Sequence, residues 1–170
     1  MDTYQKKFEL RQETPAYWHN KSNDLFVSAH TLWVSMQNNK SLEVNCCSTY
    51  KMLMGMSLEL LFKAHCVGEG ITFGATHNLV SLAKTANLTT SKDENRIFNI
   101  LSEYIIWDGR YPTPKKPPHL KSHWKNQNKV LNDNENLGNL TVQVPNNKLD
   151  FENLFPIWRK YSDLLMDKSN

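Results

Sequence analysis

The sequence lacks long apolar runs, and this absence limits where the protein can act. No stretch approaches the roughly 18 uninterrupted apolar residues of a membrane-spanning helix. Charged side chains also interrupt the first 30 residues, where a secretory signal would carry an apolar core. We therefore expect a cytoplasmic protein without a membrane partner.

Cysteine is also scarce. The three cysteines, Cys46, Cys47 and Cys66, are an odd number and show no CxxC spacing. A disulfide framework needs paired cysteines, and a structural zinc site usually needs closely spaced ones. We expect these residues to be small buried side chains, and we expect neither a metal nor a cofactor.

Proline and glycine, with seven and six residues, are too few to indicate a disordered chain. The 170 residues are 39% apolar and 22% charged, an ordinary composition for a globular protein. This length suits one domain with a substantial core and is short for two. We expect a single domain over residues 1–170.

Acidic residues are absent from one segment, between Arg110 and Lys129. The segment contains six basic residues although the whole chain has a net charge of only +3, so the remaining residues carry −3. The six are Arg110, Lys115, Lys116, Lys121, Lys125 and Lys129. The positive field is therefore local, which favours binding of an anionic partner at this segment.

Apolar residues recur at helical spacing in several places, and sustained strand-like alternation is absent. The pattern predicts an all-α fold with helices at about 15–38, 48–67, 76–87, 92–107 and 151–166. Short connections between the middle helices favour antiparallel neighbours, and hence an up-and-down bundle of four to five helices. Residues 109–149, rich in proline and asparagine, are predicted to form a long loop, in which residues 139–145 could form a short ribbon.

The predicted helix at 48–67 has a broad apolar face with a polar stripe beside it. The stripe contains Gly55, Glu59 and Lys63, each four residues apart, so Glu59 and Lys63 can form an ion pair along the helix. Such a pair is usually a surface feature. Gly55, which costs about 1 kcal/mol relative to alanine inside a helix, indicates that another backbone approaches this stripe and could bury the pair as a polar site.

Three short motifs resemble those of HEPN domains, a family of prokaryotic helical bundles. They are Glu59-x-x-x-Lys63 in "SLELLFKAHCVGEG", His77-Asn78-Leu79 in "THNLVSLAKTAN" and Arg110-Tyr111-Pro112 in "WDGRYP". The resemblance covers roughly residues 25–115. It implies a helical bundle that often dimerises. It also implies either a metal-independent endoribonuclease of a toxin–antitoxin or antiphage system, or a protein that only binds nucleotides or partner proteins.

Ribonuclease members of this family carry Arg-x(4–6)-His, which places a cation near the phosphate and a general base near the 2′-hydroxyl. None of the four arginines of this chain has a histidine five to seven positions later. Arg110 is followed by His119 only after eight intervening residues. A ribonuclease site would therefore need Arg110 to meet His119 or His77 in space, and these three are the candidate catalytic residues.

His77 has two interpretations. It lies in the first turn of its predicted helix, where the helix dipole favours a neutral imidazole. It could tie this helix to the preceding one by a hydrogen bond, or it could join Lys63 and Arg110 around one phosphate. Asn78 is a candidate capping or ligand-binding residue beside His77, and Tyr111 is a candidate packing or ligand-binding residue beside Arg110.

The segment "KKPPHLKSHWK" favours nucleic acid as the anionic partner. Lys115 and Lys116 would attract phosphates, and Trp124 offers a surface on which a base can stack. His119 and His123 have the i, i+4 spacing of metal ligands, but no carboxylate or cysteine lies near them in the sequence. A solvated basic loop without a ligand is the alternative.

Three functions stay open from the sequence. The first is a dimeric HEPN-like module that binds RNA, a nucleotide or a partner protein through a polar pocket and the basic segment, without cutting RNA, in a toxin–antitoxin, antiphage or stress system. The second is a metal-independent endoribonuclease that uses Arg110 with His119 or His77. The third is a structural adaptor. We favour the binding module because it explains the basic segment and the missing ribonuclease motif together.

Overall fold

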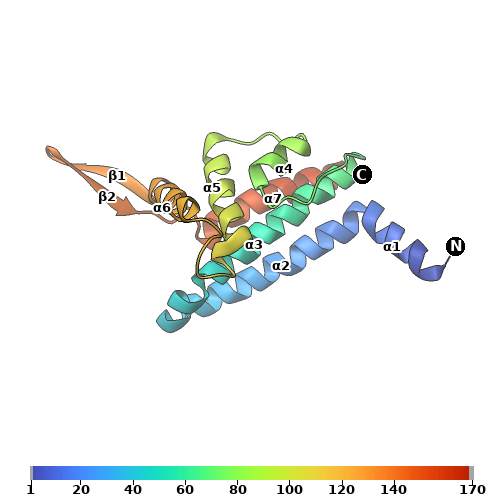
Figure 1. Cartoon of the computed structure of the whole chain (residues 1–170), viewed down its shortest axis with the longest axis horizontal. Helices are drawn as coiled ribbons and strands as arrows, with labels where there is room; N and C mark the ends of the chain where they lie inside the picture. The colour runs from blue at the N-terminus through green and yellow to red at the C-terminus, as the bar shows by residue number, and fades with distance from the viewer. Residues whose placement is uncertain (1, 169–170) are drawn as a thin grey trace.

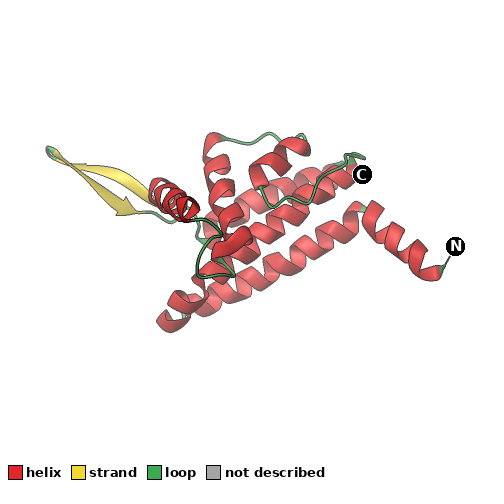
Figure 2. Cartoon of the chain, in the orientation of Figure 1, coloured by secondary structure: helices red, strands yellow, loops and turns green. Residues whose placement is uncertain are grey.

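The computed structural model describes residues 2–168, and most of these residues are helical (Figures 1 and 2). Seven α-helices, one π-helical turn and one two-stranded sheet are present in this part of the chain. The helices are α1 (Thr3–Glu13), α2 (Pro15–Gln37), α3 (Lys40–Gly68), α4 (Leu79–Thr85), α5 (Lys92–Glu103), α6 (Pro117–Leu131) and α7 (Phe151–Asp167). The π-helical turn is η1 (Tyr104–Asp108), and the strands are β1 (Asn132–Leu137) and β2 (Leu140–Pro145). Among the described residues, no helix combines the length and the apolar character that crossing a bilayer requires.

The central helix of the bundle is α3. It runs beside α2, and α4, α5 and α7 also pack against it (Figure 1). Apolar residues at helical spacing form its buried face, as the sequence predicted, and Tyr50, Met54, Leu58, Leu61 and Phe62 are among them. The ring of Phe62 meets the rings of Phe98 and Tyr161 edge to face. This contact joins α3, α5 and α7 in one core.

Two buried serines bring α2 and α3 close together. Ser22 Oγ donates a hydrogen bond to the carbonyl oxygen of Ser57 at 2.7 Å, and Ser57 Oγ donates to the carbonyl oxygen of Ser22 at 2.8 Å. The indole N–H of Trp158, on α7, donates to Ser22 Oγ at 3.0 Å. The small side chains let the two backbones approach, and the bonds satisfy polar groups that burial removes from water.

Gly55 lies where α5 and η1 pack against α3. A Cβ at this position would lie 3.1 Å from the carbonyl oxygen of Leu101 and 2.9 Å from Ile105 Cγ1. The predicted close approach of a neighbouring backbone is therefore confirmed. α5 begins with a capping box, because Ser91 Oγ accepts from the Glu94 N–H and Glu94 Oε2 accepts from the Ser91 N–H.

Three helix starts differ from the sequence prediction. The apolar pattern does not predict α1, because this helix buries none of its residues. α3 begins at Lys40, before the predicted start at residue 48, since Asn39 caps it by accepting a hydrogen bond from the Ser41 N–H. α4 begins at Leu79, after the predicted start at residue 76, since Asn78 provides the cap.

The cysteines divide between two environments. Cys66 is buried, as predicted, whereas Cys46 and Cys47 are only partly buried. The expectation of burial is wrong for the latter two because the buried face of α3 begins at Tyr50, beyond both of them. All three are free thiols.

The structure corrects the predicted long loop at 109–149. Pro117 and Pro118 occupy the first turn of α6, where the missing N–H of proline costs no helical hydrogen bond. After α6, the strands β1 and β2 form an antiparallel hairpin that projects away from the bundle (Figure 1). The prolines therefore lie at the start of a helix, and several of the asparagines lie in a β-hairpin.

The pairing of β1 with β2 gives the hairpin two unlike faces. Asn132 opposes Pro145 and Leu137 opposes Leu140, with Gly138 and Asn139 in the turn. Because successive side chains of a strand point to opposite faces, one face is rich in amides and the other is apolar and acidic. The first carries Asn132, Asn134, Asn136, Thr141 and Gln143, and the second carries Asp133, Glu135, Leu137, Leu140, Val142 and Val144.

Candidate functional site

Glu59, Lys63 and His77 form a polar cluster where α3 meets the segment before α4. Lys63 Nζ lies 2.6 Å from Glu59 Oε1, and His77 Nδ1 lies 2.9 Å from Glu59 Oε2. The side chains of Glu59 and Lys63 are 8% and 14% exposed, whereas that of His77 is 51% exposed. The Glu59–Lys63 pair is therefore a buried polar site and not a surface pair.

The contact with Glu59 determines which nitrogen of His77 carries a proton. A hydrogen bond from Nδ1 to a carboxylate oxygen requires the proton on Nδ1, so Nε2 of the neutral ring is an acceptor. No described residue forms a hydrogen bond with His77 Nε2. His77 thus ties the segment before α4 to α3, and its second nitrogen stays available to solvent or to a ligand.

Asn78 belongs to the start of α4 and not to the polar cluster. Its side-chain oxygen accepts a hydrogen bond from the Ser81 N–H at 2.8 Å. The next N–H, that of Leu79, donates to Ser102 Oγ at 2.9 Å and anchors α4 to the end of α5. These contacts fix the backbone beside His77, so Asn78 acts on the cluster by positioning it.

Arg110 lies on another part of the surface. Its Nη2 donates to the carbonyl oxygen of Ile106 at 3.0 Å, and its guanidinium lies 5.5 Å from the centre of the Tyr111 ring. Gly109 packs against Met52 of α3, whereas His77 contacts Glu59. Seven residues of α3 separate these two contacts, which is about 10 Å along the helix axis.

The predicted catalytic residues are therefore not gathered within one chain. Among the described residues, no hydrogen bond or ion pair joins Arg110 to His77 or to Lys63. His119 lies in the first turn of α6 and is exposed, and no hydrogen bond or ion pair of the described chain links its imidazole to Arg110 or His77. The structure brings together Glu59, Lys63 and His77, whereas Arg110 and His119 lie outside this cluster.

The outward side of α6 carries a second group of site residues, which we call the basic face. It consists of Lys121, Trp124, Lys125 and Lys129, all exposed, and the lysines follow one another at four-residue intervals. Trp124 is 62% exposed. Lys115 and Lys116 lie just before the helix and are exposed as well. None of these lysines forms an ion pair within residues 2–168.

A buried histidine on the inward side of α6 holds this helix against the bundle. His123 Nδ1 is hydrogen-bonded to Glu103 Oε2, and His123 Nε2 lies 3.3 Å from Asp108 Oδ2. The imidazole is 3% exposed and packs edge to face on the rings of Tyr104 and Trp107. We call the three residues Glu103, Asp108 and His123 the carboxylate clamp.

The clamp keeps His123 charged. Burial of the imidazole opposes its protonation, but the hydrogen bonds and negative charges of Asp108 and Glu103 outweigh this effect and raise the pKa of His123 to about 9. Gln127 adds a hydrogen bond from its amide to the Tyr104 hydroxyl at 2.7 Å. The orientation of the basic face is thus determined by contacts on the opposite side of the same helix.

The sequence did not predict this clamp. Its only trace there is the spacing of His119 and His123. No carboxylate lies near these histidines in the sequence, but Glu103 and Asp108 contact His123 in the folded chain. Glu103 and Asp108 come from the end of α5 and from η1, which approach α6 only in the folded chain. Between residues 2 and 168 there is no group of three or more His, Cys, Asp or Glu side chains that could hold a metal ion.

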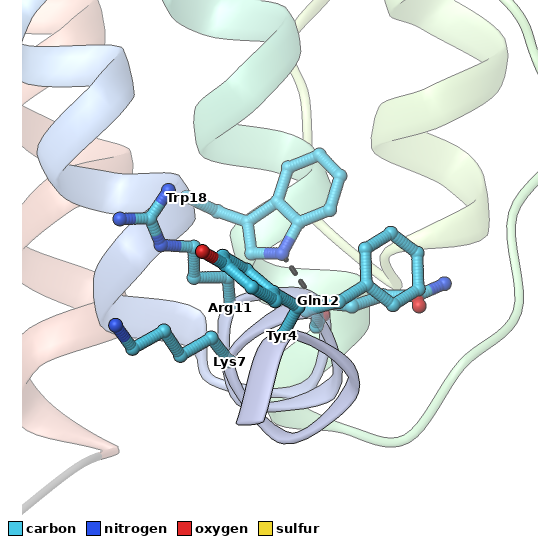
Figure 3. A pocket seen from close by; sticks show the side chains of 6 residues that line it. Tyr4, Lys7, Arg11, Gln12 and Trp18 are labelled. Carbon is cyan, nitrogen blue, oxygen red and sulfur yellow. Dashed lines mark hydrogen bonds between the residues drawn. The ribbon is translucent and has the colours of Figure 1, made fainter. Parts of the chain in front are cut away.

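A pocket of about 670 Å³ lies beside α1, where the chain turns into α2 (Figure 3). Aromatic and basic side chains line it, and the Trp18 indole N–H donates to the carbonyl oxygen of Gln12 at 3.0 Å. The lining residues are Tyr4, Lys7, Phe8, Arg11, Gln12 and Trp18. None of the predicted site residues is among them.

The class of protein that this fold defines is a helical bundle with a projecting helix and hairpin. In comparisons with known proteins, the chain matches no family model, and no curated protein or solved structure gives a significant match. The geometry of the polar cluster and of the basic face is therefore the basis on which a function can be inferred.

Proposed function

We propose that this protein is an RNA-binding helical module that resembles HEPN domains and leaves its ligand intact. The observation that carries the proposal is the basic face of α6. Its three lysines have no carboxylate partner among the described residues, and they lie beside a tryptophan that is 62% exposed. This combination of unpaired cations with an accessible aromatic ring is typical of surfaces that bind single-stranded nucleic acid.

The basic face can hold a single strand in two ways. Lys121, Lys125 and Lys129 form a row of positive charge along which phosphates can bind with release of counterions. Trp124 lies within the same row and can stack on a base that is not paired with another strand. Lys115 and Lys116 extend the positive charge beyond the start of α6. The resemblance to HEPN domains favours RNA over DNA.

Binding of a fluorescein-labelled oligouridylate, followed by fluorescence anisotropy at several salt concentrations, tests this proposal. We expect Lys121→Gln/Lys125→Gln to weaken binding and to reduce the slope of log K against log salt by about 1.4, since each phosphate contact on a single strand contributes about 0.7. We expect Trp124→Ala to weaken binding about tenfold, because stacking contributes about 1–3 kcal/mol per base.

The matched control is Lys84→Gln/Lys92→Gln, which removes the same charge from exposed sites on α4 and α5. This control should bind the oligouridylate more tightly than the α6 variant. Absence of binding by the wild-type protein would overturn the proposal, and so would equal losses in the two double variants, because the effect would then reflect net charge alone.

A second candidate function, metal-independent RNA cleavage, is supported by the Glu59–His77 contact. A carboxylate that orients an imidazole through Nδ1 leaves Nε2 as an acceptor, which is the arrangement of a general base. Lys63, bound to the same carboxylate, adds a cation close to this site. In EDTA, the protein should then cut labelled RNA, and His77→Gln should reduce the rate at least about a hundredfold, the usual contribution of a general base. Intact RNA after incubation with wild-type protein would exclude this function.

We further propose, from the same resemblance, that the protein acts as a homodimer in the cytoplasm, in a toxin–antitoxin, antiphage or stress system. A dimer would present two basic faces to one RNA, so that the second contact would form at a high local concentration. If neither binding nor cleavage of RNA is observed, the favoured function is that of an adaptor that binds a partner protein.

A further inference from the structure

A pocket of about 490 Å³ lies between the bundle and the inward side of α6. Residues of α2, α3, α6, the base of the hairpin and the segment before α7 line it, and we call it the α3–α6 pocket. Its volume is within the range of small-molecule sites. None of the residues assigned above to the basic face or to the polar cluster lines it.

A lysine without a carboxylate partner lies in the wall of this pocket. Lys51 is partly buried, and its Nζ donates to the Tyr104 hydroxyl at 3.2 Å and lies 5.0 Å from the centre of that ring. No carboxylate of the described chain lies within ion-pair distance of Nζ. Burial opposes the charge, but Tyr104 and Cys47 raise the pKa of Lys51, so the group is an ammonium at neutral pH.

Two carboxylates line the same pocket and are also unpaired within residues 2–168. Asp150 is the N-cap residue of α7, but its side chain accepts no capping hydrogen bond. Glu43, in the first turn of α3, forms no side-chain hydrogen bond or ion pair with any described residue. Burial, Glu152 and Glu43 raise the pKa of Asp150, and the positive charge of Lys51 only partly offsets them. A ligand cation between Asp150 and Glu43 would reduce the remaining repulsion.

The apolar part of the wall is held in place by its own hydrogen bonds. The rings of Trp33 and Tyr50 lie 5.1 Å apart at an angle of 36°. The Trp33 indole N–H donates to Glu152 Oε1 at 3.0 Å, and the Tyr50 hydroxyl donates to the carbonyl oxygen of Leu149 at 3.1 Å. Tyr50 is fully buried, so it supports the partly exposed ring of Trp33, which is thus preorganised for a small apolar group.

These charges select the class of ligand. A phosphate-bearing molecule would be repelled by Glu43 and Asp150, and a simple amine would be repelled by Lys51. We propose that the α3–α6 pocket binds a free α-amino acid, whose carboxylate contacts Lys51, whose ammonium contacts Asp150 and Glu43, and whose side chain packs on Trp33. The ligand would join α6 to the bundle, because Gln127 and Leu131 of α6 form part of the same wall.

A thermal-shift screen with the standard L-amino acids, one at a time at millimolar concentration, tests this site, and isothermal titration calorimetry then gives the affinity of each that raises the melting temperature. We expect at least one to bind. The amine that lacks its carboxylate and the carboxylic acid that lacks its amine should each bind at least about tenfold more weakly, because each leaves one charged side of the pocket without a partner.

Two variants and a control connect binding to the pocket. Glu43→Gln changes an exposed side chain that no described residue contacts by a hydrogen bond or ion pair, so it should fold normally and bind the amino acid about tenfold more weakly. Lys51→Met should abolish binding. If Lys51→Met does not fold, Asp150→Asn serves as the second variant in its place. Glu135→Gln, on the projecting hairpin, should bind like wild type.

Several outcomes would overturn the assignment. The proposal is wrong if no amino acid raises the melting temperature, or if the amine or the acid alone binds as tightly as the amino acid. It is also wrong if Glu43→Gln and the second variant, Lys51→Met or Asp150→Asn, both bind the amino acid with the affinity of the wild type. RNA binding by the basic face is measured separately, so failure of one proposal leaves the other standing.

Discussion

Gly109 lies just after η1, at the point where the chain leaves the bundle toward α6. A Cβ at this position would lie 2.5 Å from Met52 Cβ, and that atom cannot rotate away as the end of a side chain can. We expect Gly109→Ala to lower the free energy of unfolding by about 1–3 kcal/mol, the usual cost of overpacking a filled site. Urea denaturation followed by tryptophan fluorescence measures this loss.

Gly74 supplies the matched control, because nothing lies within 4 Å of a Cβ built there. Gly74→Ala should change the free energy of unfolding by no more than about 0.5 kcal/mol. Equal losses in the two variants would contradict the explanation, since contact with Met52 would then not be their cause.

Single residues differ in how well their sequence context predicts their role. The Glu59–Lys63 pair follows from a four-residue spacing on one helix, and Gly55 made a covered stripe one of the two alternatives. The partner of Glu59 was harder to predict, because His77 is 18 residues away and meets Glu59 only through tertiary packing. Arg110 is exposed, and its guanidinium binds the carbonyl oxygen of Ile106 and lies near the Tyr111 ring.

At the scale of elements, α6 is the part that most depends on its contacts with the rest of the chain. Only His123 and Val130 of this helix are buried, so apolar packing alone does little to hold it. The carboxylate clamp therefore makes a large contribution to its docking, and this contribution requires a protonated imidazole. Since the folded-state pKa of His123 is about 9 and a histidine in an unfolded chain titrates near 6.5, the clamp stabilises the fold when the ring is charged.

The sign of the pH dependence follows from this raised pKa. The stabilisation is complete below about pH 6.5 and is lost as the pH rises through about 9. We expect the free energy of unfolding of the wild-type protein to fall over this window by an amount on the order of 3 kcal/mol. Urea denaturation at both ends of the window measures the change.

His123→Gln serves as the reference, because other groups that titrate in the same window are present in both proteins. The difference in stability between wild type and variant should be largest near pH 6 and should shrink toward pH 9.5. A difference that stays constant across this range would show that His123 contributes through packing and not through its charge.

Elements were predictable where burial imposes a period on the sequence. The stripe of α3 and the capping box of α5 both leave a local trace, and both features are present in the structure. α6 leaves almost none, since its inward side carries a histidine and amides and its first residues are prolines. Proline breaks a helix interior but suits a first turn, so the position of Pro117 and Pro118 matters more than their number.

At the scale of the whole molecule, positive charge is concentrated on α6 and the residues just before it, while the remainder of the chain carries a net −3. A polyanion therefore meets attraction on one side of the protein and repulsion elsewhere. This charge distribution was visible in the sequence. The arrangement of the lysines was not, because the segment was predicted to be a loop, whereas α6 presents Lys121, Lys125 and Lys129 as an ordered row.

The projecting hairpin has one further property, which follows from its pairing. Strand side chains alternate with a period of two, so a shift of one residue between β1 and β2 would exchange the positions of the amide and apolar groups along the slipped strand. The hairpin would then have two mixed faces in place of one rich in amides and one that is apolar and acidic. The length of the turn at Gly138 and Asn139 therefore keeps the amide side chains on one face and the apolar and acidic side chains on the other.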